Sequence, residues 1–437
     1  MHPAAKEQQH MKRTITAAAG LAALTLALSA CGGSAGSSSA SDDSTLTISG
    51  WSVDTTPEFQ LLADGFEAQH EGVTVEVVDY DPTEYNTLVT ADLAAGKGPD
   101  IVTQKEVKFL TTFQEGGQLL DVSDVEVPDG IGGLDSYTVD GTRYAVPYRQ
   151  DSWVLYYDKA LFDEAGVAYP DGSWTWDDYD AAAEELTAAL DGPKGTYEHG
   201  WQSTLQGFAT AQSAGADILS GDYGYFAPFY ERTLTLQDDG AQQSFNTVSA
   251  NQLTYQGEFG KQNAAMMPMG TWYVATLISQ QASGEADDFD WGIAPIPQLD
   301  ASTTGTDQTP VTFGDPTGFG VNANVSDAKA ELAKEFLAYA ASEEAATALA
   351  GIGITPALLT DPVVDAYFAV DGAPQDELST FAVQTHDTKP ENPASDKTAA
   401  VQNILNDMHS AILSGSQDVD SAIADAEGRV ANEVGLD

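Results

Sequence analysis

The stretch Gly98-Pro99-Asp100-Ile101-Val102 decides the fold, because it begins the third strand of an alternating series of strands and helices. Two short β runs precede it, at residues 46–49 and 73–78. A helical spacing of apolar residues follows the first run at 59–66, and a second helix is predicted over 85–95. The βαβαβ order predicts a parallel sheet with helices on both faces, which binds ligands at the carboxyl ends of its strands.

Three further helices are predicted later in the chain. Thr175-Trp176-Asp177-Asp178 begins one, with acidic residues in the first turn that suit the helix dipole. Ser326 caps another that runs through Ala341. Apolar residues over 401–412 form a late helix that ends at Gly415. The chain therefore alternates strands and helices over most of its length.

Length and charge narrow the class of protein. The chain has 437 residues, 42% of them hydrophobic, which suggests two or three domains with substantial cores. It carries 67 acidic and 17 basic residues, a formal net charge of -50. Binding to nucleic acid needs clustered cations, so this composition argues against a nucleic-acid partner. An anionic membrane surface would also repel the body of the protein.

No cofactor or metal is predicted. Neither a GxGxxG nor a Walker-type loop follows any predicted strand. The histidines lack the spacing of metal ligands. The chain contains His2, His10, His70, His199, His386 and His409.

The N-terminus has the layout of a secretory signal. Lys12-Arg13 precede an apolar run over 15–28, which ends in Leu28-Ser29-Ala30-Cys31. This ending resembles the lipobox of bacterial lipoproteins, whose cysteine is acylated after cleavage just before it. Residues 1–30 are therefore predicted to be a signal peptide, and 31–43 a flexible tether rich in Gly and Ser. The resemblance implies a lipid anchor at Cys31, the only cysteine, on the outer face of the cell membrane.

Several motifs occur in one order from about residue 45 to the C-terminus. That order resembles the extracellular solute-binding proteins of the maltose-binding type, the binding subunits of ABC importers. Two features depart from the family. Asp158 stands where the family usually has Asn, and the segment 216–256 is short and atypical for the family. The motifs are Gly98–Val102, Leu120–Ser123, Tyr144–Tyr148, Leu155–Phe162 with Ala165-Gly166, Thr175–Tyr179, Phe259–Lys261 with Ala265–Met267 and Gly270–Trp272, and Glu331–Leu337.

The resemblance implies an α/β fold of two lobes, each a mostly parallel sheet with flanking helices, joined by crossing strands. Lobe I would comprise 44–149 plus 317–355, and lobe II 150–316 plus 356–437. The crossings would fall near 148–152, 312–316 and 355–358. The implied function is to bind a sugar or small oligosaccharide in the cleft between the lobes, as a monomer, and to deliver it to the permease subunits of the importer.

A sugar-binding cleft needs carboxylates and amides for hydroxyl groups and flat aromatic rings for C–H faces. Residues just after the first and third strands, on the crossings, and in the Gly-x-Trp motif meet this need by position. Each also has a structural reading: a tryptophan can be packing, an acid can be solvated surface, and Arg149 can form an ion pair with Asp151. The predicted ligand-binding residues are Trp51, Asp54, Gln104, Glu106, Tyr148, Arg149, Asp151, Trp201, Gln202, Trp272, Phe313 and Asp315.

Three other classes stay open. A secreted glycoside hydrolase would need a catalytic pair of carboxylates, and the many acids permit one, although no catalytic motif marks it. A passive scaffold or adhesin would not need hinge crossings. The same fold could bind an oligopeptide, a polyamine or a phosphorylated compound. The sequence favours a binding protein that is not an enzyme.

Overall fold

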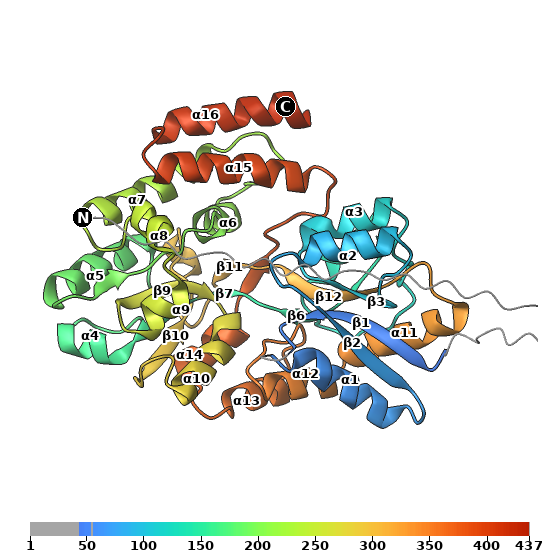
Figure 1. The fold of residues 1–437 in the computed structure, drawn as a ribbon. Helices are drawn as coiled ribbons and strands as arrows, with labels where there is room; N and C mark the ends of the chain where they lie inside the picture. The colour runs from blue at the N-terminus through green and yellow to red at the C-terminus, as the bar shows by residue number, and fades with distance from the viewer. Residues whose placement is uncertain (1–42, 54–55, 437) are drawn as a thin grey trace, which may run out of the picture. The chain divides into compact units, whose positions relative to one another are not determined.

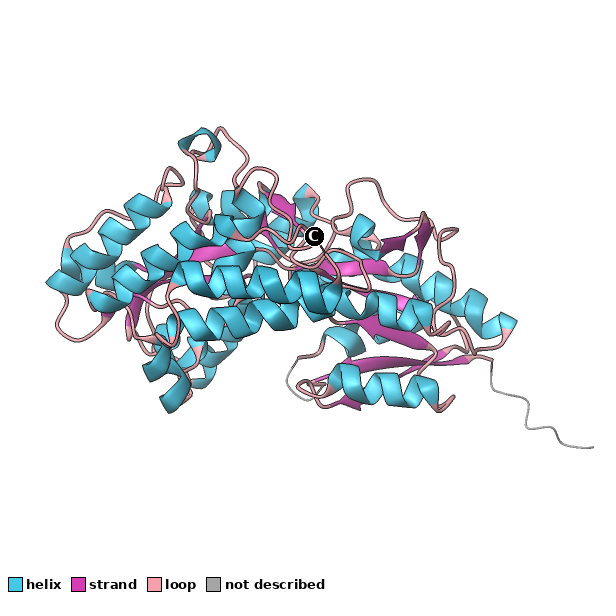
Figure 2. Ribbon diagram, turned by 90° about the horizontal axis from the view of Figure 1, so that it is seen from above, coloured by secondary structure: helices cyan, strands magenta, loops and turns pink. Residues whose placement is uncertain are grey.

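The structure is a computed structural model that describes residues 43–53 and 56–436 (Figure 1). The predicted signal peptide, Cys31 and the tether up to residue 42 lie outside the described residues, as does Asp54. The described residues contain two main β-sheets, each flanked by helices, which Figure 2 shows from above. Among them, no helix has the length and apolar character needed to cross a membrane.

The first sheet has the strand order β2-β1-β3-β12-β6. β1 pairs in parallel with both β2 and β3, so the predicted βαβαβ order is confirmed. β12 is antiparallel to both of its neighbours. The strands are β1 (Thr45–Trp51), β2 (Thr74–Tyr80), β3 (Ile101–Gln104), β6 (Val146–Gln150) and β12 (Pro316–Val321).

Helices cover both faces of this sheet (Figure 1). Ile101 and Val102 are adjacent in β3 and fully buried, but they belong to different cores because successive side chains point to opposite faces. Ile101 packs in the core under α1 and α11, and Val102 in the core under α2 and α3. The helices are α1 (Glu58–Gln69), α2 (Tyr85–Ala94), α3 (Leu110–Glu115), α11 (Asp327–Ala340) and α12 (Glu343–Ala350).

The second sheet has the strand order β10-β7-β9-β8. β7 is antiparallel to both β9 and β10, whereas β8 is parallel to β9, so β8, β9 and β10 run in one direction and β7 alone runs against them. The reason is the hinge: β7 begins next to the first sheet, and β9 runs back alongside it, so that Trp153 pairs with Gly270. The strands are β7 (Trp153–Asp158), β8 (Lys194–Thr196), β9 (Ala264–Gly270) and β10 (Trp291–Ala294).

A larger set of helices surrounds the second sheet. The capping box at Thr175 is present, with Thr175 accepting from the Asp178 N–H, and Ser326 caps α11. These helices are α4 (Lys159–Ala165), α5 (Trp176–Ala189), α6 (Ser203–Gln212), α7 (Ala227–Asp238), α8 (Phe245–Asn251), α9 (Tyr255–Gly260), α10 (Trp272–Ser283), α13 (Asp361–Phe368), α14 (Glu377–Gln384), α15 (Thr398–Leu413) and α16 (Val419–Arg429).

Short crossing segments connect the first sheet to the second lobe. Only Asp151 and Ser152 separate β6 of the first sheet from β7 of the second. Gly314 and Asp315 separate β12 from β11 (Val311–Phe313), which pairs with β13 (Asp387–Lys389). A Cβ on Gly314 would lie 2.1 Å from the carbonyl oxygen of Asp151, so the two crossings approach too closely for any side chain there.

Candidate ligand-binding site

A network of charges joins the two sheets at the first crossing. Arg149 lies on β6, and its Nη1 atom is 2.8 Å from Oε2 of Glu58, the first residue of α1. Its Nε atom is 2.7 Å from Oδ2 of Asp151. The other carboxylate oxygen of Asp151 accepts a hydrogen bond from the hydroxyl of Thr271 at 2.9 Å. The network therefore runs from a helix of the first lobe to the residue that precedes Trp272 in the second.

Glu58 is the costly member of this network. Its side chain has no exposure to solvent. Burial raises the pKa of Glu58 above its usual value, and the positive charge of Arg149 opposes that rise. The hydroxyl of Tyr148 lies 3.4 Å from Oε1 of Glu58. The buried carboxylate thus depends on Arg149 for its charge compensation.

Beyond Thr271 lies a cluster of four aromatic side chains, Trp272, Tyr255, Trp201 and His199, here called the aromatic cluster. The ring centroid of Trp201 is 6.5 Å from that of Trp272, 5.7 Å from Tyr255 and 4.4 Å from His199. Burial raises the pKa of Tyr255, whose hydroxyl also interacts with Trp272 and lies within the field of Asp151 and Arg149. The aromatic cluster and the charge network are therefore neighbours.

Trp201 is the most accessible member of the aromatic cluster, with 42% of the residue exposed. The exposed indole leaves a flat apolar face open to a ligand. Flat aromatic faces beside carboxylate and guanidinium groups can hold a ligand that has both apolar faces and hydroxyl edges.

On the first sheet, Trp51 ends β1 and contacts Phe59 and Tyr85 edge to face, at 4.9 and 5.1 Å between centroids. The ammonium group of Lys105 lies 5.2 Å from the Trp51 ring centroid, a cation–π distance. Glu106 pairs with Lys108 and accepts a hydrogen bond from Asn86. These side chains lie at the carboxyl ends of the strands, as the sequence predicted for Trp51 and Glu106.

Three predicted residues are almost completely buried. Tyr148 stacks on Phe319 with ring centroids 4.3 Å apart, and Phe313 stacks on Trp153 at 5.2 Å. Gln104 turns its side chain back onto the carbonyl of Val102, and its Oε1 atom has no hydrogen-bond partner in the described part of the chain. In this conformation these side chains support the crossing region from inside.

Two predicted residues belong to a separate hydrogen-bonded chain. The carboxylate of Asp315 accepts from the backbone N–H groups of Glu391 and Asn392 and from Nδ2 of Asn392, at 2.6–3.1 Å. Gln402 on α15 donates to Oδ1 of Asn392, and Gln202 donates to Gln402. This chain ties the second crossing to α15 and to the start of α6. It is distinct from the aromatic cluster.

The sequence interpretation missed Glu58, Thr271, Tyr255 and His199. Thr271 stands next to Trp272 in a quoted motif, so it could have been included. Glu58 looked like an ordinary acid in the first turn of a helix. Nothing in the local pattern distinguishes Tyr255 or His199.

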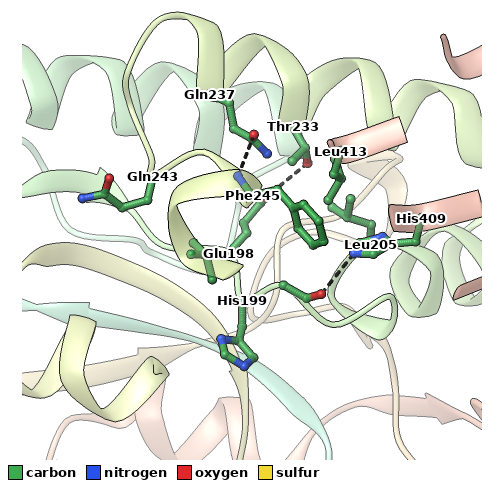
Figure 3. A pocket seen from close by; sticks show the side chains of 11 residues that line it. Glu198, His199, Leu205, Thr233, Gln237, Gln243, Phe245, His409 and Leu413 are labelled. Atoms are coloured by element: carbon green, nitrogen blue, oxygen red, sulfur yellow. Dashed lines mark hydrogen bonds between the residues drawn. The ribbon is translucent and has the colours of Figure 1, made fainter. Parts of the chain in front are cut away.

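The described residues offer no group of three or more His, Cys, Asp or Glu side chains that could hold a metal ion. A cavity of about 480 Å³ lies beside the crossings, lined by Gln150, Gly314 and the segments 131–136 and 388–394. A second cavity, inside the second lobe, has a volume of about 10 Å³ and could hold no more than one water molecule (Figure 3).

The two sheets, their short crossings and the aromatic cluster beside the hinge define a two-lobed α/β binding protein. The chain belongs to the bacterial extracellular solute-binding protein family, and the sequence model of that family matches residues 52–347. The resemblance inferred from the motifs is thereby confirmed.

Relatives and solved structures agree with this assignment. A sugar transporter from Rhizobium etli, in an open conformation, is 32% identical with a TM-score of 0.77, covering 88% of this chain and 98% of its own. The arabinooligosaccharide-binding protein of Bacillus subtilis strain 168 is 25% identical over 69% of this chain and 74% of its own. The maltodextrin-binding protein of the same strain is 25% identical over 73% of this chain and 74% of its own. The predicted two-lobed fold is confirmed.

Proposed function

We propose that the chain binds a sugar or small oligosaccharide in a cleft between its two lobes and delivers it to the permease subunits of an ABC importer. The aromatic cluster beside the Arg149–Asp151 pair is the observation that carries the proposal. Trp201 and Trp272 would stack on sugar faces, and the carboxylate of Asp151 at the hinge would accept hydrogen bonds from sugar hydroxyl groups. The names of relatives that bind arabinooligosaccharides and maltodextrins support a carbohydrate ligand.

The first lobe would supply the opposite wall of the cleft. Trp51 ends β1, and Asp54 and Glu106 come shortly after β1 and β3 in the sequence, at the strand ends where α/β proteins bind ligands. A ligand that touches both lobes favours the closed arrangement over the open one, because only the closed arrangement makes both sets of contacts. Gln104, Tyr148, Gln202, Phe313 and Asp315 would shape this cleft indirectly, through the packing and hydrogen bonds described above.

We further propose that the protein is a lipoprotein anchored through acylated Cys31 to the outer face of the cell membrane. The signal-like layout of residues 12–31 and the Gly/Ser tether support this proposal. Two acyl chains give stable anchoring where one does not. We also propose that the protein is monomeric and binds without catalysis, as befits a binding subunit.

A thermal-shift screen of the mature protein tests the proposed ligand class. The panel contains maltotriose, α-1,5-arabinotriose, N,N′-diacetylchitobiose and tagatose, with spermidine, a tripeptide and glucose 6-phosphate as the non-sugar arm. A ligand that binds only the folded state at 100 times its Kd adds about 2.7 kcal/mol of stability. We expect at least one sugar to raise Tm and to show a defined Kd by calorimetry. A rise with spermidine, the peptide or the phosphate alone would replace the sugar proposal.

A further inference from the structure

His199 lies in the aromatic cluster and has a ring nitrogen that forms no hydrogen bond with the described part of the chain. Its Nδ1 atom is 2.7 Å from the hydroxyl of Tyr197, and that hydroxyl donates its single proton to the carbonyl of Leu253 at 3.2 Å. With that proton directed to Leu253, the Tyr197 oxygen accepts from the imidazole, and we assign the His199 proton to Nδ1. Nε2 then carries a lone pair, and no residue among 43–53 and 56–436 donates to it.

The imidazole is neutral at physiological pH. Burial lowers the pKa of His199 to about 4, so the ring stays uncharged near neutrality. A neutral ring with Nδ1 protonated donates from Nδ1, and its Nε2 atom can only accept.

The segment that carries His199 is held rigidly on both sides. The carboxylate of Glu198 pairs with Arg232 and accepts from Thr233 and Gln242. The carbonyl of Gly200 lies 3.2 Å from Nε2 of His409, a side chain only 1% exposed. Figure 3 shows the His199 imidazole directed away from Phe245 and His409 in the interior. The ring is thus preorganised on the side where the other aromatic residues lie.

Its neighbours are apolar faces. The imidazole meets the indole of Trp201 at 4.4 Å and 88°, and the ring of Tyr255 at 5.6 Å and 79°. A sugar ring has C–H groups on its face and hydroxyl groups at its edge. The C–H face can stack on the aromatic rings, and a hydroxyl at the edge can donate to the lone pair of the imidazole. We propose that His199 is a specificity-determining residue, whose Nε2 atom accepts a hydrogen bond from one hydroxyl of a sugar stacked on the aromatic cluster. This inference rests on the proposed function.

Substitution of His199 by asparagine or by glutamine distinguishes the roles of the two imidazole nitrogens. In His199→Asn the amide reaches the position of Nδ1 and can keep the bond to Tyr197, whereas in His199→Gln it reaches the position of Nε2. Calorimetry with the sugars of the panel should show about tenfold weaker binding for His199→Asn, because a ligand hydroxyl loses its partner. His199→Gln should stay within about threefold of the unsubstituted protein. His70→Asn is the matched control, since His70 stacks on Phe66 at the end of α1, and its affinity should not change.

Long-range ¹H–¹⁵N spectra of the histidine rings give a second readout. At pH 7, the resonance lost in His199→Gln should have the shifts of an Nδ1–H tautomer, and its Nε2 shift should move when the sugar is added. Unchanged affinity of a folded His199→Asn, equal losses in the Asn and Gln variants, or an Nε2–H tautomer would each overturn the role of His199 and leave the proposed function standing. If none of the sugars binds the unsubstituted protein, the proposed function fails, and the role of His199 fails with it.

Discussion

The Nη1 atom of Arg149 lies 2.8 Å from Oε2 of Glu58, a carboxylate that the folded chain shields completely from water. The same guanidinium holds Asp151, whose other oxygen reaches Thr271 beside the aromatic cluster. A guanidinium that forms one ion pair with each of two acids fixes their relative position and compensates their charge. The ion pairs of Arg149 therefore hold the hinge together, and removing this cation should lower the stability of the folded protein.

Arg149→Met should lower the free energy of unfolding by about 3–5 kcal/mol at pH 7, because it leaves Glu58 buried and uncompensated. Urea denaturation measures the loss. Arg429→Met is the control, since Arg429 pairs with Asp407 and Glu433 on the surface, and it should cost at most about 1 kcal/mol. Equal losses in the two variants would contradict the role of Arg149.

The Arg149→Met loss should also depend on pH. Glu58 already has a raised pKa in the folded state, and removing Arg149 raises it further. An acid whose pKa is higher in the folded than in the unfolded state stabilises the fold at low pH and loses that contribution as pH rises. The cost of Arg149→Met should therefore shrink between pH 7 and pH 5. Glu58→Gln in the same background should recover part of the stability at pH 7 and remove this pH dependence.

Trp272→Ala should weaken sugar binding by about 2–4 kcal/mol, because it removes a stacking platform of the aromatic cluster. Trp51→Ala should act in the same direction but more mildly, since Lys105 already occupies part of its surroundings. Calorimetry measures both, with circular dichroism as the folding control. Tyr169→Ala changes a ring with 37% exposure outside the cluster and should leave affinity unaltered. An unaltered affinity in the Trp272 variant would mean that the ligand binds elsewhere.

Glu391 should make stability fall with rising pH. Burial, together with the negative charge of Asp315, raises the pKa of Glu391 from its ordinary value of 4.5 to about 8. Its protonated form favours folding, so this contribution is complete below pH 4.5 and is lost as pH rises to 8. Glu391→Gln should be more stable than the unsubstituted protein at pH 8, on the order of 1 kcal/mol given its partial exposure. Chemical denaturation at pH 6 and pH 8 should show no such gain for the exposed Glu433→Gln.

Cys31→Ala should abolish membrane association while leaving the body folded, because the predicted anchor lies outside both lobes. Fractionation of cells that lack the importer measures this directly, and mass spectrometry of the mature N-terminus detects the acyl chains. If the Cys31 variant sediments with membranes as fully as the unsubstituted protein, the anchor lies elsewhere.

The protein should return oligosaccharides intact after prolonged incubation, as read by mass spectrometry. Asp315 and Glu391 are the pair of carboxyl groups that most resembles a glycosidase pair. Burial raises the pKa of Asp315 to about 6 and that of Glu391 to about 8, and a glycosidase requires a raised pKa of its general acid. However, three hydrogen bonds from residues 391 and 392 already occupy the carboxylate of Asp315. Release of shorter sugars that disappears in Glu391→Gln would instead establish hydrolysis.

The site could be predicted only where strand ends or motifs mark it. Trp51 and Glu106 follow predicted strands, and Trp272 ends a motif, so position along the chain indicated them. Phe313 looked equally suitable on a crossing, but its ring packs on Trp153 and Phe208 inside the second core. Successive side chains of a crossing strand point to opposite sides, and sequence alone does not tell which side faces the core.

The sequence by itself determined the first three strands, the helices between them and their parallel arrangement. Apolar spacing, caps and short connections are local, and β1, β2 and β3 pair as the βαβαβ order requires. The tertiary structure alone decided the antiparallel pairing of β7 with β9, the burial of Glu58 against Arg149, and the approach of Trp201 to Tyr255. Glu58 and Arg149 are 91 positions apart, and β7 and β9 are separated by more than 100 residues. Such contacts depend on how lobes and chain crossings pack in space, which local propensities do not encode.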